Sequence, residues 1–199
     1  MARSNNTSEH MRSTPLTPPR QTYTVEITGL QRELPLFEVA PGLRIAVLNI
    51  LGDTELVQAC AAALADKLAT CAYDILITAE AKSIPLAHAL SVATHKPYVV
   101  LRKVYKPYMG VALSAETVSI TTGAPQMLYL DEKDYGIVRD QRAVLVDDVI
   151  STGSTLEGMR LLMNKAGAEV VAMAAIFTEG EPEQWDQVIR LGHLPLFKS

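Results

Sequence analysis

The chain has 199 residues, of which 48% are hydrophobic and 20% are charged, and its formal net charge is −4. This length suits a single domain, because typical domains hold roughly 100–200 residues, and the composition excludes wholesale disorder and a fibrous class. The negative charge provides no general attraction for nucleic acid or anionic lipid, so any anionic ligand has to be held by a local site.

Residues 1–22 are polar and rich in Ser, Thr and Pro. They carry too little apolar surface to offset the entropy of ordering, so a disordered tail is expected, with Met11 as a second candidate start residue. The chain has no run of about 18 apolar residues and no signal-peptide pattern at its start. Cys60 and Cys71 lie outside any CxxC pair or Cys/His cluster, which favours free thiols and a reducing, cytoplasmic location.

The single folded domain is expected over residues 23–199. Residues 23–27 alternate in polarity, which predicts a strand at a sheet edge or in a covering layer, and an apolar run follows at 44–50. Asp53 is a candidate N-cap for a helix over 54–69, because apolar residues recur there at helical spacing.

Two strand–helix–strand units follow in the pattern of apolar residues. The first has strands at 75–78 and 97–101 around a helix at 85–94, and the second has strands at 143–146 and 170–177 around a helix at 155–166 that ends at Gly167. Such continuous apolar runs suit strands buried on both faces. The predicted fold class is therefore α/β, with an open, mostly parallel twisted sheet flanked by helices.

The segment between the two units, residues 102–140, lacks helical periodicity. Within it, 117–121 and 127–130 are predicted to pair as a hairpin. Long irregular segments in compact domains are often lids, so we expect a small hood or flexible loop here. After the second unit, the apolar residues Trp185, Val188, Ile189 and Leu191 predict the inward face of a short helix. A base wall and a subunit contact are the alternatives for Trp185.

The most informative segment is AVLVDDVISTGST, residues 143–155. Asp147 and Asp148 follow an apolar strand, and in open α/β sheets ligands bind beyond the carboxyl ends of strands. The next residues form a loop that opens a helix, and its hydroxyls, backbone N–H groups and helix dipole suit a phosphate monoester. That loop comprises Ser151, Thr152, Gly153, Ser154 and Thr155.

Carboxylates accept hydrogen bonds from sugar hydroxyls, so the acids and the loop together fit a ribose 5-phosphate. The alternatives are an ordinary capped helix after a strand, a Mg²⁺ site and a phosphoacceptor aspartate. A nucleoside triphosphatase is disfavoured, because the loop lacks the Lys and the glycine spacing of a Walker A motif.

At these residues the sequence resembles the type I phosphoribosyltransferase family, whose motif is four hydrophobic residues, two acids and a Thr/Ser-Gly-x-Thr loop. A weaker likeness covers about residues 23–180 and is greatest to adenine and xanthine phosphoribosyltransferases and related purine repressor domains. The resemblance implies that the loop and both acids bind 5-phosphoribosyl-1-pyrophosphate (PRPP). It also implies that Asp147 and Asp148 hold Mg²⁺, directly or through water, and that the protein is a homodimer.

The same resemblance implies a pyrophosphate site. Ala81, Lys82 and Ser83 would contact the pyrophosphate after the strand at 75–78, although many relatives have Gly in place of Ser83. The basic stretch with Arg102, Lys103 and Lys106 would neutralise the leaving pyrophosphate, with Lys103 as a catalytic residue. A solvated Lys82 and a plain surface patch are the alternative interpretations.

Phe177 and Glu179 lie where relatives contact the base, although Phe177 fits a core position equally well. The implied function is transfer of the phosphoribosyl group of PRPP to a purine base in nucleotide salvage. Adenine is favoured, because Ser151 stands where oxopurine-specific relatives often have an acid. The alternative is a PRPP-binding regulator or inactive relative.

Overall fold

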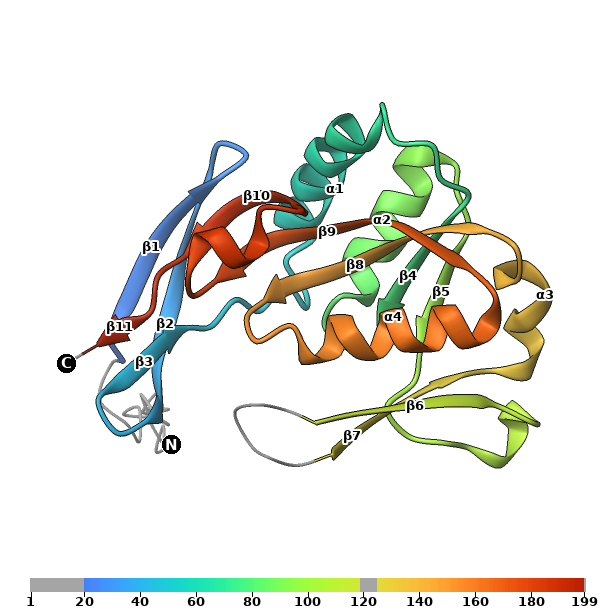
Figure 1. Ribbon diagram of the computed structural model, residues 1–199. Coiled ribbons are helices and arrows are strands. Elements are labelled where there is room, and N and C mark those ends of the chain that lie inside the picture. Colours follow the sequence, from blue (N-terminus) through green and yellow to red (C-terminus); the bar gives the residue numbers. More distant parts are fainter. Residues whose placement is uncertain (1–19, 119–124, 199) are drawn as a thin grey trace, which may run out of the picture.

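The computed structural model describes residues 20–118 and 125–198. Its centre is a five-stranded parallel sheet in the order β10-β9-β8-β4-β5, which confirms the predicted α/β class (Figure 1). The strands are β4 (Ile75–Ala79), β5 (Tyr98–Leu101), β8 (Arg142–Ile150), β9 (Glu169–Glu179) and β10 (Val188–Leu194).

Helices cover both faces of this sheet (Figure 1). The helices α1 (Thr54–Leu68) and α2 (Ile84–Thr94) share one hydrophobic core with the sheet, and α4 (Ser154–Ala166) shares a second core with its other face. The helices predicted at 54–69, 85–94 and 155–166 are confirmed to within one residue. The predicted cap is also present, because the Asp53 carboxylate accepts a hydrogen bond from the N–H of Leu56 at 3.2 Å.

Two predictions near the ends of strands were wrong. Strand β8 does not stop before the acids but continues to Ile150, because the longer β9 pairs with it as far as Thr178. The segment after β9 is a 3₁₀ turn, η3 (Pro182–Trp185), followed by strand β10, and not one short helix. Its residues Val188 and Ile189 are β-branched and suit a strand that pairs with β9.

A second, antiparallel sheet lies beyond the carboxyl ends of the parallel strands (Figure 1). We call it the terminal sheet; it consists of β1 (Thr22–Ile27), β2 (Leu30–Ala40), β3 (Leu43–Ala46) and β11 (Phe197–Lys198). Of the residues assigned to the tail, Thr22 belongs to β1, and the guanidinium of Arg20 lies 3.8 Å from the ring centre of Phe37. The rest of that tail, residues 1–19, lies outside the described residues.

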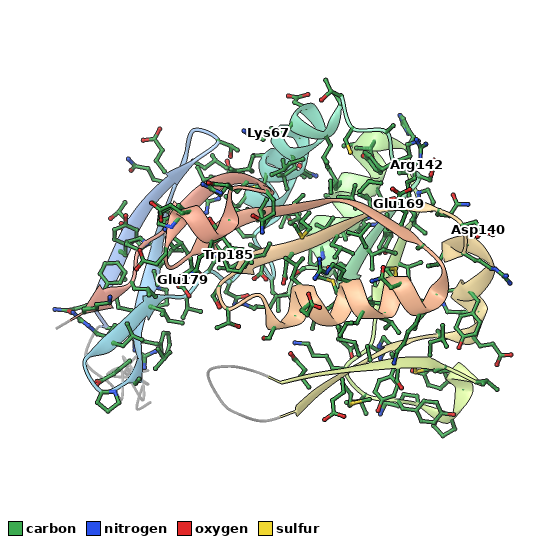
Figure 2. All side chains as sticks on the ribbon, in the orientation of Figure 1. Lys67, Asp140, Arg142, Glu169, Glu179 and Trp185 are labelled. Carbon is green, nitrogen blue, oxygen red and sulfur yellow. The ribbon has the colours of Figure 1, made fainter. Side chains whose placement is uncertain are left out.

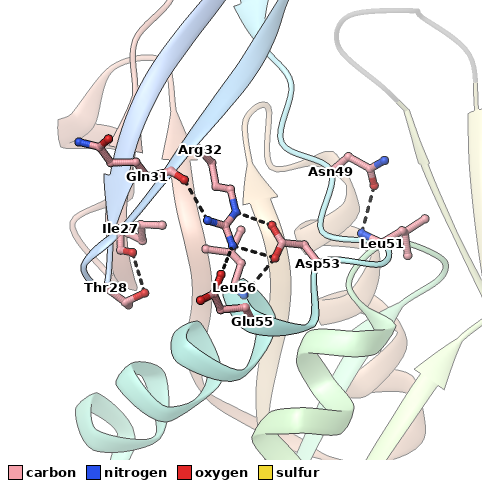
Figure 3. A network of polar contacts seen from close by, with 9 residues as sticks. All are labelled: Ile27, Thr28, Gln31, Arg32, Asn49, Leu51, Asp53, Glu55 and Leu56. Carbon is pink, nitrogen blue, oxygen red and sulfur yellow. Dashed lines mark hydrogen bonds and ion pairs between the residues drawn. The ribbon is translucent and has the colours of Figure 1, made fainter.

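Arg32 joins the terminal sheet to the helix layer (Figure 3). Its guanidinium donates two hydrogen bonds to Asp53, of 2.6 and 2.9 Å, and one of 2.9 Å to Glu55 at the start of α1. Bidentate contacts of this kind fix orientation as well as distance. These bonds anchor the end of the linker between β3 and α1, residues 47–53, to the terminal sheet.

The predicted hairpin is present as β6 (Leu113–Val118) and β7 (Pro125–Leu130), paired antiparallel; residues 119–121 of the prediction lie outside the described residues. It runs beside α4, where Lys165 Nζ donates to the carbonyl of Ser114 at 2.8 Å (Figure 1). Two short turns, η1 (Pro107–Met109) and η2 (Glu132–Asp134), and helix α3 (Tyr135–Val138) complete this region. No helix in the described ranges is long and apolar enough to span a bilayer.

Candidate functional site

The loop between β8 and α4 forms a small cradle at the carboxyl end of the sheet. It surrounds a cavity of about 50 Å³ lined by Asp147, Val149, Ile150, Ser151, Thr152, Gly153, Ser154, Thr155 and Leu156. The first N–H groups of a helix have no intrahelical partner, and Gly153 stands at the N-cap of α4. The cradle therefore contains backbone N–H groups and hydroxyls, which are the donors that a small anion requires.

Trp185, in the connection between β9 and β10, packs against the loop at Gly153 and lines a separate cavity beside it, not the cradle itself. Its indole Nε1 donates to the carbonyl of Glu179 at 2.9 Å, and its ring lies so close to Gly153 that a Cβ there would be 2.8 Å from it. Figure 2 shows Trp185 and Glu179 at the end of the sheet opposite to Arg142 and Glu169. Sequence patterns assigned Trp185 to a helix face, and no local signal in the sequence indicated its contact with the loop.

The acid pair lies within the carboxyl-terminal half of β8, beside the loop that follows β4. Asp148 is only 4% exposed, and its N–H donates to Asp147 Oδ1 at 2.9 Å. Ser83 Oγ lies 2.5 Å from the same Asp147 oxygen. Burial, together with the neighbouring charge of Asp148, raises the pKa of the Asp147 carboxyl well above its ordinary value.

Lys82 neutralises part of this acid pair. Its Nζ lies 3.1 Å from Asp148 Oδ2, in an ion pair whose geometry makes no hydrogen bond, and donates to the carbonyl of Leu48 at 3.3 Å. Leu48 belongs to the linker held by Arg32. The ammonium therefore bridges the linker and the acids, while Ala81 beside it is exposed and the Glu80–Ala81 peptide is cis.

The predicted basic stretch divides into two parts. Arg102 is held by Glu80, with Nε donating to the carboxylate at 2.6 Å, and the backbone N–H of Lys103 donates to the same carboxylate at 2.5 Å. Partial burial acts to raise the pKa of Glu80, but these hydrogen bonds outweigh it and the pKa is lowered. The side chains of Lys103 and Lys106 are exposed and enter no ion pair within the described ranges, so they are the cations that remain available for an anion.

The two residues predicted to meet a base differ in their surroundings. Phe177 is only 2% exposed and packs against Gly192 and Ile27 in the main core, so its ring has little free surface. Glu179 is 5% exposed, and its carboxyl has no hydrogen-bond or ionic partner among the described residues. Burial raises the pKa of Glu179 to about 7.

Replacing Glu179 with Gln is expected to stabilise the protein at about pH 8 and to leave its stability unchanged at about pH 4. The pKa of Glu179 is raised in the folded state. The contribution of its carboxyl to folding stability is therefore full below the unfolded pKa and is lost as pH rises through about 7. At about pH 8 the free energy of unfolding of the variant should exceed that of the wild-type protein by about 2 kcal/mol, a value already reduced for the access of solvent to the carboxyl. Thermal unfolding across this range tests it, with exposed Glu183→Gln as control; an equal gain at both pH values would refute the cause given.

Two larger cavities adjoin this region. One of about 390 Å³ lies beside the linker, with walls that include Leu34, Leu48 and Asn49. The other, of about 820 Å³, opens along the edge strand β5 and is lined in part by Glu80 and Arg102, but by neither acid of the pair. The first adjoins the acid pair through Leu48, whose carbonyl accepts a hydrogen bond from the lysine that neutralises Asp148.

The acid pair also fits a magnesium ion. No cluster of three or more His, Cys, Asp or Glu side chains suited to a metal occurs in the described part of the chain. Magnesium, however, is usually held by one or two carboxylates together with waters and substrate phosphates. Asp148 Oδ2, buried without a hydrogen bond, is an oxygen of the kind that such an ion requires.

Comparison with known proteins begins with a family model described as "Phosphoribosyl transferase domain", which matches residues 47–189. The hypoxanthine/guanine phosphoribosyltransferase of Methanococcus voltae is 37% identical over 108 residues, covering 54% of this chain and 54% of that protein. The protein of the same name from Methanotorris igneus is 39% identical over 109 residues, covering 54% and 55%. The chain thus spans about half the length of the curated relatives that it matches.

Solved structures resemble the whole fold. Adenine phosphoribosyltransferase from Thermoanaerobacter pseudethanolicus superposes with a TM-score of 0.61 at 19% identity, covering 87% of this chain and 95% of that one. The Trypanosoma brucei adenine phosphoribosyltransferase, in complex with AMP, pyrophosphate and ribose-5-phosphate, superposes with a TM-score of 0.56 at 20% identity. This match covers 72% of this chain and 67% of that one. At such identities the likeness establishes the fold.

Proposed function

Because the chain belongs to the phosphoribosyl transferase domain family, we propose that it is a purine phosphoribosyltransferase, which transfers the phosphoribosyl group of PRPP to a purine base and releases pyrophosphate. The observation that carries this proposal is the acid pair in the carboxyl-terminal half of β8 next to a cradle the size of one small anion. A ribose 5-phosphate bound here would have its phosphate in the cradle and its ring hydroxyls at the acid pair.

The proposal gives each group a role. The loop residues 151–155 bind the 5-phosphate through N–H groups and hydroxyls, and Asp147 and Asp148 accept hydrogen bonds from the ribose hydroxyls. Magnesium, held by the same acids directly or through water, would supply positive charge for the substrate phosphates. Lys103 and Lys106, exposed and without an ion pair to any described residue, would meet the leaving pyrophosphate, whereas Arg102 first has to leave Glu80.

The reaction breaks the bond between ribose C1 and the pyrophosphate oxygen as a base nitrogen bonds to C1. As in glycosyl transfer generally, the transition state resembles an oxocarbenium ion. The protein contributes by fixing the ribose against the acids, by stabilising the charge of the departing pyrophosphate and by limiting the access of water. The base proton leaves to solvent or to the pyrophosphate.

The identity of the base is a finer proposal. The curated relatives are named for hypoxanthine and guanine, and the solved structures for adenine, so these names favour no single purine. We favour adenine because Ser151 provides a hydroxyl where an acid would suit an oxopurine. Glu179 is the proposed base contact, since its raised pKa leaves a carboxyl that can both donate and accept near neutral pH.

Release of pyrophosphate from PRPP and Mg²⁺ should be measured with adenine, hypoxanthine, guanine, xanthine, uracil and orotate in turn. We expect release with a purine, fastest with adenine. Release with an oxopurine alone would refute the preference for adenine, but it would agree with phosphoribosyl transfer to a purine. Binding of PRPP without release for any base would refute the transferase and favour a PRPP-sensing regulator.

A further inference from the structure

Ser83 occupies the N-cap position of α2, yet its hydroxyl caps nothing. A serine at this position ordinarily accepts a hydrogen bond from an N–H of the first helical turn. Here the side chain is turned away from the helix, and the residue is only 2% exposed. Its hydroxyl is directed to the acid pair, which lies 64 and 65 residues further along the chain.

The hydroxyl contacts both acids at once. Its oxygen lies 2.5 Å from Asp147 Oδ1 and 3.1 Å from Asp148 Oδ1, and it accepts the N–H of Asp148 at 3.1 Å. A serine hydroxyl has a single proton to donate, and the shorter distance assigns this proton to Asp147. Asp147 Oδ1 thus receives two hydrogen bonds, from Ser83 and from the N–H of Asp148.

These two hydrogen bonds fix Oδ1 of Asp147 on the side of Ser83, so that Oδ2 is the oxygen that they leave for other contacts. Asp147 also lines the cradle of the phosphate loop, so its remaining oxygen is the one available to a ligand there. The carboxylates of half-buried Asp147 and buried Asp148 repel each other, and an Asp147 side chain that lost its donor would turn toward solvent or toward Lys82.

We propose that Ser83 is a positioning residue, whose hydroxyl holds Asp147 so that its free oxygen can accept a ribose hydroxyl. This inference rests on the proposed function only in assigning the ribose to the acid pair. It replaces the expectation that Ser83 contacts pyrophosphate, because its hydroxyl is buried against the acids while Ala81 and Lys82 beside it are exposed.

The test compares Ser83→Ala and Ser83→Thr with Ser91→Ala. Ser91 is a matched control because it lies on the same helix and its hydroxyl donates to the carbonyl of Lys96 at 2.6 Å, away from the acids. Calorimetry measures the binding of ribose 5-phosphate, 2-deoxyribose 5-phosphate and inorganic phosphate to each variant. Thermal unfolding shows that each variant is folded.

Ser83→Ala is expected to weaken ribose 5-phosphate about 10-fold or more, to reduce the preference for ribose over deoxyribose, and to leave inorganic phosphate unchanged. In turnover it should raise KM for PRPP but not KM for the base. Ser83→Thr, which retains the hydroxyl, should restore much of the loss, and Ser91→Ala should cause none.

Two results would overturn the inference in distinguishable ways. If the wild-type protein prefers ribose and Ser83→Ala retains that preference in full, the positioning role is wrong and the proposed function stands. If the wild-type protein binds ribose 5-phosphate and 2-deoxyribose 5-phosphate equally, the acids do not contact the 2-hydroxyl, and the ribose assignment on which the inference rests is wrong; pyrophosphate release with a purine then tests the proposed function separately.

Discussion

Replacing Asp147 and Asp148 together with asparagine is expected to lower pyrophosphate release at least about 10³-fold. Hydrogen bonds to charged groups contribute about 1.5–3 kcal/mol each, and the double variant loses the charge from both acceptors. The loss should persist at saturating PRPP, because positive charge on the ribose grows toward the transition state and the carboxylates favour it.

The same change is expected to raise the melting temperature at about pH 8. Burial raises the pKa of Asp147, so its contribution to stability is full below the unfolded pKa and is lost as pH rises through the folded one. Asparagine avoids this penalty, and a gain of about 1–2 kcal/mol corresponds to roughly 2–8 °C for a chain of this size. The gain should shrink toward about pH 4, where the carboxyl is neutral.

A matched control is the double change Asp140→Asn and Asp186→Asn, whose side chains are 85% and 77% exposed. It alters the net charge equally and should change neither activity nor melting temperature. If the double variant of the acid pair keeps activity within tenfold of the wild-type protein, the acids are not the ribose site.

Replacing Gly153 with Ala is the second change with a large expected effect. Gly153 has φ +76°, a conformation that costs an L-residue about 1–2 kcal/mol, and the new Cβ would lie 2.8 Å from the Trp185 ring. Because Trp185 is 8% exposed and bonded to the carbonyl of Glu179, the ring cannot simply swing aside. The loop itself should shift, and binding of ribose 5-phosphate and of inorganic phosphate should weaken more than about 10-fold.

The variant Gly29→Ala separates the cost of the backbone conformation from the effect of the collision with Trp185. Gly29 has φ +78° with nothing within 4 Å of its Cβ position, so this variant carries the backbone penalty without a collision. It should lose stability but bind phosphate normally. Calorimetry gives the affinities, and fluorescence of Trp185, the single tryptophan of the chain, reports the loop directly. Equal phosphate affinity in the two variants would show that the contact with Trp185 does not shape the cradle.

The sequence was sufficient for four of the five strands of the parallel sheet and for the segment that carries the acids and the loop. Apolar runs and helical spacing depend on neighbouring residues, so the helices and the strands β4, β5 and β9 could be located. The acids and the loop at 147–155 form one continuous segment, and their proximity needed no knowledge of the tertiary structure. For the same reason the cap at Asp53 was predicted correctly.

Contacts between distant segments could not be predicted in this way. The terminal sheet pairs strands from both ends of the chain, and the contact between Trp185 and Gly153 arises only when the two loops meet. The pairing of Ser83 with Asp147 spans 64 residues. The homodimer, the cytoplasmic location, the bound magnesium and the domain limits stay predictions.

The central claim is that this chain joins the ribose of PRPP to a purine, and the most direct measurement follows the ribose itself. PRPP with labelled ribose is incubated with Mg²⁺, adenine and the protein, and the products are separated. The account predicts labelled nucleoside 5′-monophosphate in equal amount to pyrophosphate, absent with the double asparagine variant of Asp147 and Asp148. Pyrophosphate with free labelled ribose 5-phosphate, or no product with any purine, would contradict it.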